Sequence, residues 1–147
     1  MPNWCSNNVT VEHSDPTMID KFEQAVRDDN LFQTFVPLAE WSWDDAVESW
    51  GAKWDISEGE VIDRCNPETL CVVFETAWSP PCAFYDKLME QGFAVNGQFF
   101  ESSFVGQYVN GEEVSYDVDP DDLSNIPEEL NEMWSITELY EDWDDEQ

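Results

Sequence analysis

The sequence predicts an α+β protein in which two helices cover one face of an antiparallel sheet. Strand-like and helix-like segments follow one another in the order strand, helix, strands, helix, strands, which is typical of a split β–α–β sandwich. A capping residue followed by proline predicts the start of each helix, at Ser14-Asp15-Pro16 and at Ser79-Pro80-Pro81. A chain of 147 residues has the size of one domain and is long enough to bury one core.

The N-terminal third begins with a strand and a helix. Alternating β-branched residues predict a strand from Asn8 to Glu12. After Pro16, apolar side chains recur at helical spacing until about Asn30. We expect residues 31 to 38 to be extended, and a short helix from Asp44 to Ser49 within a tryptophan-rich stretch. Gly51 is placed to close that helix.

The middle of the chain predicts two hairpins separated by the second helix. The first hairpin turns at Asn66-Pro67-Glu68 and the second at Asn110-Gly111, the stronger of the two turn signals. Between the two hairpins, Phe84, Leu88 and the intervening residues predict the second helix, which ends at Gln91-Gly92. The expected strands are residues 61–65, 69–75, 93–95, 98–102, 105–109 and 112–118.

The composition changes at Asp117, and the remainder of the chain is dominated by Asp and Glu. One amphipathic run interrupts this acidic segment, formed by Leu130, Met133, Trp134, Thr137, Leu139 and Tyr140. We expect it to form a helix that packs on the domain through its aromatic side chains. The predicted organisation is therefore a domain over residues 1–116 and an acidic helical extension over residues 117–147.

Charge is the outlying property of this sequence. It holds 34 acidic against 5 basic residues, a formal net charge of −29, and no Lys or Arg follows Lys87. Such a surface repels nucleic acid and anionic membranes and attracts basic protein surfaces. Acidity that serves solubility or adaptation to salt is the competing explanation, and the sequence leaves both open.

Targeting and ligand signals are few. The first residues contain neither a charged nor an apolar segment of a secretory signal, and no apolar run is long enough to span a membrane. We therefore expect a cytoplasmic protein whose cysteines, Cys5, Cys65, Cys71 and Cys82, stay reduced. Because these do not form a C-x-x-C pair and His13 is the single histidine, we expect neither a metal site nor a cofactor.

Three features of the sequence could carry chemistry: side chains that could react, an EF-hand-like pattern of acids, and a tryptophan-rich motif. Nothing in the spacing brings a cysteine to His13 as nucleophile and base, and carboxylates are too abundant to mark an active site, so we do not expect an enzyme. Asp117, Asp119, Asp121 and Glu128 occupy four ligand positions of an EF-hand, but Asp122 replaces its essential glycine.

The third motif is Trp-Gly-Ala-Lys-Trp-Asp at residues 50–55. Trp50 and Trp54 flank Lys53 and would allow stacking on a base or ring. In the structural interpretation, the two indoles cap the sheet and Lys53 pairs with an acid. Phosphate repulsion by so acidic a chain favours the structural interpretation.

Three segments carry a resemblance to a known family: Asn3-Trp4-Cys5-Ser6-Asn7-Asn8, the motif at residues 50–55, and Phe74-Glu75-Thr76-Ala77-Trp78-Ser79-Pro80-Pro81. Their order and spacing over roughly residues 3 to 110 resemble the YubB-type ferredoxin-like proteins of phages and plasmids. The resemblance implies a ferredoxin-like sandwich, without an iron–sulfur cluster. It also implies a mobile-element origin, and hence the host cytoplasm. It implies no particular biochemical activity.

The function that these observations favour is mimicry of nucleic acid. Duplex DNA carries about one charge per 1.7 Å, so an excess of 29 charges equals that of about 50 Å of duplex. We expect the protein to inhibit a basic host protein, a nucleic-acid-binding enzyme or a defence complex, without binding nucleic acid or membrane itself. The alternative is an adaptor that docks on a host protein through its aromatic C-terminal helix. The oligomeric state stays open.

The predicted partner-binding residues all lie in the acidic extension, where carboxylates supply charge and aromatic side chains supply specific contacts. They are Asp117, Asp119, Asp121, Asp122, Glu128, Glu129, Trp134, Tyr140, Glu141, Asp142, Trp143, Asp144 and Asp145.

Overall fold

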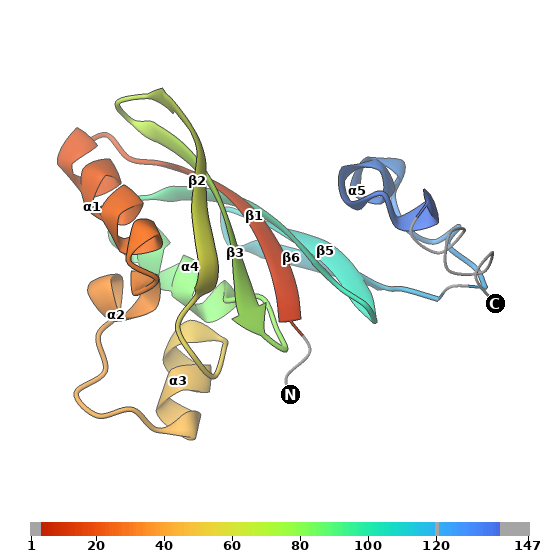
Figure 1. The fold of residues 1–147 in the computed structure, drawn as a ribbon, viewed down its shortest axis with the longest axis horizontal. Helices are drawn as coiled ribbons and strands as arrows, with labels where there is room; N and C mark the ends of the chain where they lie inside the picture. Colours follow the sequence, from red (N-terminus) through yellow and green to blue (C-terminus); the bar gives the residue numbers. More distant parts are fainter. Residues whose placement is uncertain (1–3, 120, 139–147) are drawn as a thin grey trace.

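The computed structural model describes residues 4–119 and 121–138 (Figure 1). In chain order the elements are β1 (Trp4–Glu12), α1 (Pro16–Arg27), α2 (Leu31–Phe35), α3 (Trp43–Trp50), β2 (Ser57–Asn66), β3 (Thr69–Ala77), α4 (Cys82–Glu90), β4 (Ala94–Glu101), β5 (Phe104–Val109), β6 (Glu112–Asp117) and α5 (Glu128–Trp134).

The six strands form one antiparallel sheet in the order β2-β3-β1-β4-β5-β6. Strand β3 lies between β1 and β2, and β1 lies between β3 and β4, so each of the two helical crossovers skips one strand. The β5–β6 hairpin extends the sheet beyond β4 and turns at Asn110 and Gly111, both with positive φ, as the sequence predicted. The predicted α+β class with an antiparallel sheet is confirmed.

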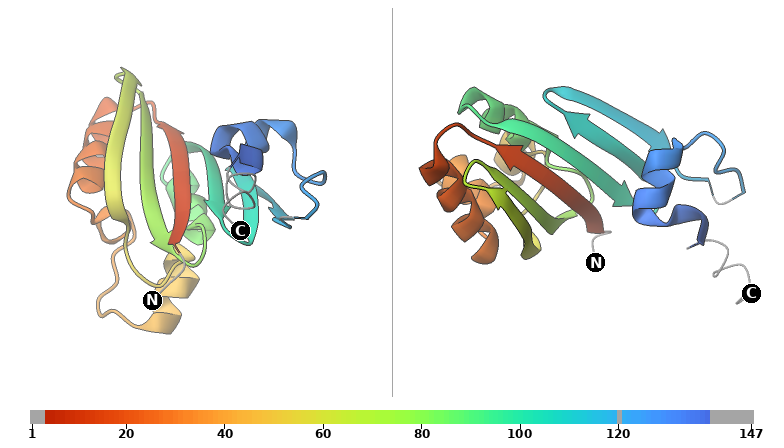
Figure 2. Two further views of the ribbon diagram at one scale, coloured as in Figure 1. Left: turned by 45° about the vertical axis from the view of Figure 1, so that its right-hand side comes forward. Right: turned by 90° about the horizontal axis from the view of Figure 1, so that it is seen from above.

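Helices α1 to α4 cover one face of this sheet (Figures 1 and 2). Alternate strand residues point toward them, among them Val9, Val11 and Val72, which are fully buried. Phe22 of α1 and Phe84 of α4 are buried in the same core. Because strand side chains alternate between faces, Ser6, Asn8 and Thr10 lie on the other face.

The C-terminal segment covers part of that other face (Figure 2). A second apolar cluster is formed by Val105, Val118, Ile126, Leu130 and Ile136. Trp134 packs against this cluster, and its ring stacks on Phe100 with a centroid distance of 5.9 Å. The expectation that the extension forms a helix and packs through an aromatic side chain is confirmed for Trp134, whereas Leu139 and Tyr140 lie outside the described residues.

Several sequence expectations about the helices and strands were wrong. Strand β1 begins at Trp4, four residues before its expected start at Asn8, and the strands expected at residues 93–95 and 98–102 are the single strand β4. Residues 31–35, expected to be extended, form helix α2, because the Asp55 carboxylate accepts hydrogen bonds from the backbone N–H groups of Phe32 and Gln33 at its start. Strand β2 begins at Ser57, four residues before its expected start at Val61. The helical layer holds α1 to α4, where two covering helices were expected; the short helix expected at Asp44 to Ser49 is α3. Among the described residues, no helix has the length and apolar character needed to cross a membrane.

Candidate functional site

The three motifs that carry the family resemblance meet at one end of the fold. The Asn7 side-chain amide donates to Oγ1 of Thr76, 3.0 Å away, joining β1 to β3. The Ser79 hydroxyl donates to the carbonyl of Gly51 at 2.6 Å. A Cβ on Gly51, where φ is +81°, would lie 3.1 Å from the backbone nitrogen of Cys82. The tight turn after α3 is therefore fitted against the start of α4, and only glycine allows both the turn and the approach.

Two residues of the Trp-Gly-Ala-Lys-Trp-Asp motif are structural. Trp50 is buried and its Nε1 donates to the carbonyl of Val36 at 2.8 Å. Asp55 accepts hydrogen bonds from three backbone N–H groups, those of Phe32, Gln33 and Ile56. Burial raises the pKa of Asp55 above its ordinary value, although these three donors act in the opposite direction. This half of the motif fixes α2 and the segment that leads into β2.

The other half of the motif builds an exposed aromatic group that we call the tryptophan cluster: Trp41, Trp43, Trp54 and Trp78 around Lys53. The Trp78 ring stacks with Trp43 and with Trp54, each at a centroid distance of 5.9 Å. The Lys53 ammonium lies 4.0 Å from the Trp43 ring centre, 4.4 Å from that of Trp54 and 5.2 Å from that of Trp78. Trp41 Nε1 donates to the Lys53 carbonyl at 2.9 Å. Lys53, expected to pair with an acid, instead sits among three indole rings.

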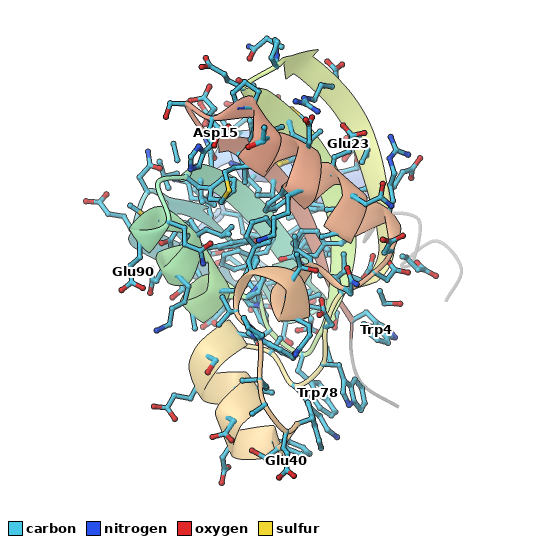
Figure 3. The ribbon with its side chains drawn as sticks, turned by 90° about the vertical axis from the view of Figure 1, so that its left-hand side faces the viewer. Trp4, Asp15, Glu23, Glu40, Trp78 and Glu90 are labelled. Atoms are coloured by element: carbon cyan, nitrogen blue, oxygen red, sulfur yellow. The ribbon has the colours of Figure 1, made fainter. Side chains whose placement is uncertain are left out.

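These four indoles are not part of the core. Their exposed fractions run from 38% for Trp54 to 52% for Trp41 and Trp43, whereas large aromatic side chains are ordinarily mostly buried. Trp4, 41% exposed, pairs with Ala77 and lies with Trp78 in the lower part of Figure 3. Trp78 also has a positive φ of 66°, which is unfavourable for a bulky side chain. The fold thus holds apolar rings at the surface at some energetic cost.

Exposed carboxylates belong to the same stretches of chain as the tryptophan cluster. Five exposed acids come from the same or adjoining segments: Glu40, Asp44, Asp45, Glu48 and Glu58. Glu40 is labelled at the lower end of Figure 3. With the Lys53 ammonium held over the rings, the exposed charges of these segments are negative, and the exposed indoles share this end of the fold with acidic side chains.

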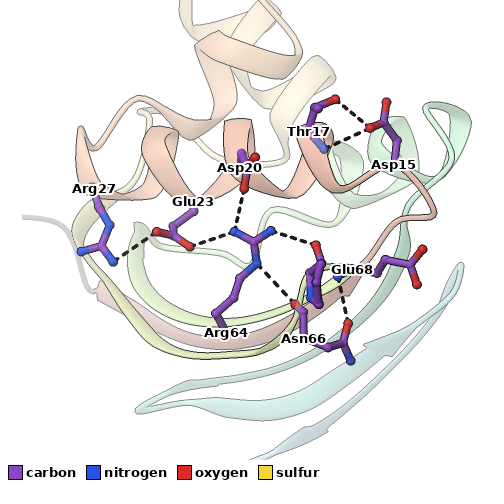
Figure 4. A network of polar contacts seen from close by, with 9 residues as sticks. Asp15, Thr17, Asp20, Glu23, Arg27, Arg64, Asn66 and Glu68 are labelled. Atoms are coloured by element: carbon purple, nitrogen blue, oxygen red, sulfur yellow. Dashed lines mark hydrogen bonds and ion pairs between the residues drawn. The ribbon is translucent and has the colours of Figure 1, made fainter.

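Most of the basic side chains interact with acidic or aromatic side chains of the same chain. Arg64 reaches Asp20 at 2.8 Å and Glu23 at 3.2 Å, and Arg27 reaches Glu23 at 3.3 Å (Figure 4). The ammonium of Lys21 lies 4.9 Å from the Phe35 ring centre. Within the described part of the chain, Asp20 and Glu23 are the only acids in ion pairs. The other carboxylates there lack a cationic partner in the fold.

The predicted acidic site lies elsewhere. Its first six acids, Asp117, Asp119, Asp121, Asp122, Glu128 and Glu129, are exposed between β6 and the first turn of α5. This segment lies on the side of the sheet opposite α3 (Figures 1 and 2). Hydrogen bonds from the Ser124 hydroxyl and backbone N–H lower the pKa of Asp122. Tyr140, Glu141, Asp142, Trp143, Asp144 and Asp145 lie outside the described residues.

Trp134 is packed against the sheet and is not a fully exposed side chain available to a partner. Its ring is half-buried and stacked on Phe100, and its Nε1 is enclosed without a hydrogen-bond partner. It contributes to docking the extension on the sheet, and its predicted contact with a partner stays a prediction.

The His13 ring is held by contacts with two backbone groups. Its Nε2 lies 2.9 Å from the Gln91 carbonyl, and its Nδ1 accepts from the backbone N–H of Asp15. The ring packs edge-on against Phe93 and lines a hollow of about 760 Å³ with Glu12 and Glu68. No group of three metal-ligating side chains occurs among residues 4–119 and 121–138.

No family model, curated protein or solved structure matches the chain. The resemblance to the YubB-type family therefore stays a prediction. We did not predict the tryptophan cluster from the sequence, although the sequence contained a signal for it. Trp41, Trp43 and Trp54 fall within 14 positions, and Trp78 belongs to one of the three motifs that carry the family resemblance.

Proposed function

We propose that the protein is a non-enzymatic binding protein of phage or plasmid type, that it occupies the basic nucleic-acid site of a host protein, and that the tryptophan cluster is its anchor. The observation that carries the proposal is the set of four exposed indoles held around Lys53, on segments that also carry exposed carboxylates.

The aromatic part of the proposal rests on what makes an interface tight. Trp is enriched among the few residues that dominate binding energy, especially when water-excluding contacts surround it. Stacking of Trp43 and Trp54 on Trp78 fixes these side chains before binding, so little rotamer entropy remains to be lost. A rigid aromatic surface can therefore give slow dissociation from a small contact area.

The acidic part of the proposal rests on charge that the fold leaves uncompensated. A channel lined with Lys and Arg gains free energy when carboxylates replace its counterions, as it does with phosphates. The acids around the tryptophan cluster would lie against that channel, and Asp117, Asp119, Asp121 and Asp122 would add long-range attraction. Such attraction acts mainly on the association rate.

The fold resemblance is part of the same proposal. The order β2-β3-β1-β4, with α1 and α4 as crossovers, supports a ferredoxin-like unit that β5, β6 and the extension enlarge. The alternative of an adaptor docking through the aromatic C-terminal helix has less support, because Trp134 of α5 is stacked on Phe100.

The test separates anchor from charge on one captured partner. Partners are captured from host lysate at low salt and released at high salt, and the recovered protein is used in surface-binding kinetics. We expect Trp43→Ala together with Trp54→Ala to raise the dissociation rate by about tenfold or more, the effect of losing hot-spot side chains. We expect neutralising Asp117, Asp119, Asp121 and Asp122 to Asn to lower the association rate instead.

Ile62→Ala is the matched control, because Ile62 is an exposed apolar residue (57%) on β2, outside the tryptophan cluster. Circular dichroism confirms that each variant is folded. If the double tryptophan variant dissociates no faster than Ile62→Ala, the tryptophan cluster is not the anchor.

A further inference from the structure

The β2–β3 hairpin contains an irregularity that changes which way two residues point. Asn66 pairs with Thr69, but the next pair is Asp63 with Cys71. Two residues of β2, Arg64 and Cys65, therefore stand opposite the single residue Leu70, which is a β-bulge. Without the bulge, Cys65 would pair with Leu70 and share its face, since a one-residue change of register reverses the side-chain direction.

The consequences of the bulge are visible on both faces of the sheet. Arg64 turns toward α1, where it binds Asp20 and Glu23, and it also donates to the carbonyl of Pro67 at 2.8 Å (Figure 4). Cys65 turns to the face of Cys71, and the two Sγ atoms lie 3.8 Å apart. The hairpin thus aligns two thiols that lie six positions apart in the chain.

The two thiols differ in accessibility. Cys65 is exposed on the edge strand β2, and Cys71 is half-buried on β3. The Sγ of Cys65 lies 3.5 Å from a carboxylate oxygen of Asp63, and that of Cys71 lies 3.4 Å from the Thr10 hydroxyl. An oxidant in solution can reach Cys65 first, and the second thiol is then already beside it.

We propose that Cys65 and Cys71 form a redox modification site, at which a small-molecule disulfide such as oxidised glutathione converts the two thiols into a cross-strand disulfide. The Cys65 thiolate attacks the reagent, which releases one reagent thiol and leaves a mixed disulfide on Cys65. The Cys71 thiolate then attacks Sγ of Cys65 and displaces the second reagent thiol. Two protein thiols are oxidised, one reagent disulfide is reduced to two thiols, and both protons go to the departing thiolates.

The other two cysteines serve as internal controls. Cys5 is fully buried, and burial raises its pKa to about 12. Cys82 donates its S–H to a carboxylate oxygen of Glu113 at 3.3 Å, and burial again raises its pKa. Since the thiolate is the reacting form, both should stay reduced while the Cys65–Cys71 pair reacts.

We expect the pair to react slowly at neutral pH. Hydrogen bonds that join the Cys65 thiol to Cys71 and to Asp63 raise its pKa to about 11, so only a small fraction is thiolate at any time. The experiment therefore follows the end product of a long incubation.

The fully reduced full-length chain is incubated with glutathione disulfide, and intact mass and peptide maps are recorded. The expected product has lost two hydrogen atoms, carries no glutathione, and links the peptides of Cys65 and Cys71. Cys71→Ser should stop at a stable glutathione adduct on Cys65, and Cys65→Ser should give no intramolecular bond. Because the disulfide restricts the unfolded chain, the oxidised protein should also melt at a higher temperature than the reduced one, by a small amount since the closed loop is short.

Two outcomes overturn the proposal. One is a wild-type chain that accumulates the same stable glutathione adduct as Cys71→Ser, because the second thiol then does not reach the first. The other is a cross-link that involves Cys5 or Cys82. Both readouts need no binding partner, so failure here leaves the proposed function untouched.

Discussion

Replacing Lys53 with methionine tests whether the lysine organises the tryptophan cluster. The ammonium lies between 4.0 and 5.2 Å from three indole centres, and one cation–π contact at an exposed site is worth about 0.5–1 kcal/mol. Because one charge is shared by three rings, we expect Lys53→Met to lower the free energy of unfolding by about 1–2 kcal/mol. Methionine keeps an unbranched apolar side chain, so the loss reports mainly on the charge.

The control is Lys87→Met, which removes the same charge from an exposed position in the last turn of α4. That lysine interacts with a helix terminus, and its loss should cost about 0.3–1 kcal/mol. Both variants are unfolded in urea at fixed ionic strength and followed by far-ultraviolet circular dichroism, since tryptophan fluorescence changes with the mutation itself. Equal losses in the two variants would show that the rings gain nothing specific from Lys53.

Two further predictions concern the sheet and its extension. Glu101 is buried, and burial alone would raise its pKa, but hydrogen bonds from Ser103 and Ser102 hold the pKa below its ordinary value of 4.5. A lowered pKa contributes stability above the unfolded value that is lost as pH falls through the folded one. Glu101→Gln should therefore cost about 1–3 kcal/mol at pH 7 and less in acid, as measured by urea titrations from pH 7 to 3; a pH-independent difference would contradict this. A chain ending at Tyr116 should still unfold cooperatively, because the main core has no described member after Tyr108, but at a lower temperature, because Val105 loses its cover. Calorimetry checks this, and an aggregated product would show that the extension completes the core.

Elements with local signals were predicted well from the sequence. Asp15 and Pro16 begin α1 as expected, with the Asp15 carboxylate accepting from the Thr17 backbone N–H, and Gly51 ends α3 in a left-handed conformation. These signals lie within a few residues of the structure they specify, so a single sequence reveals them.

Elements that depend on distant partners were missed. Helix α2 is capped by Asp55, which lies 23 positions from Phe32 along the chain. A pattern of neighbouring residues cannot predict a cap supplied from so far away. The tryptophan cluster joins residues before α3, at the first position of α3, after α3 and after β3. Its exposure depends on where those segments end in space, which hydrophobic patterning does not encode. The acidic extension was found easily because composition alone marks it.

The central claim, occupancy of a basic nucleic-acid site, is tested most directly by competition. The captured partner is bound to the immobilised protein at constant ionic strength, and duplex or single-stranded nucleic acid is titrated in. The account predicts that nucleic acid displaces the partner completely, and that rising salt weakens both complexes steeply. A partner that binds this protein with unchanged affinity while its nucleic-acid channel is saturated would contradict the account.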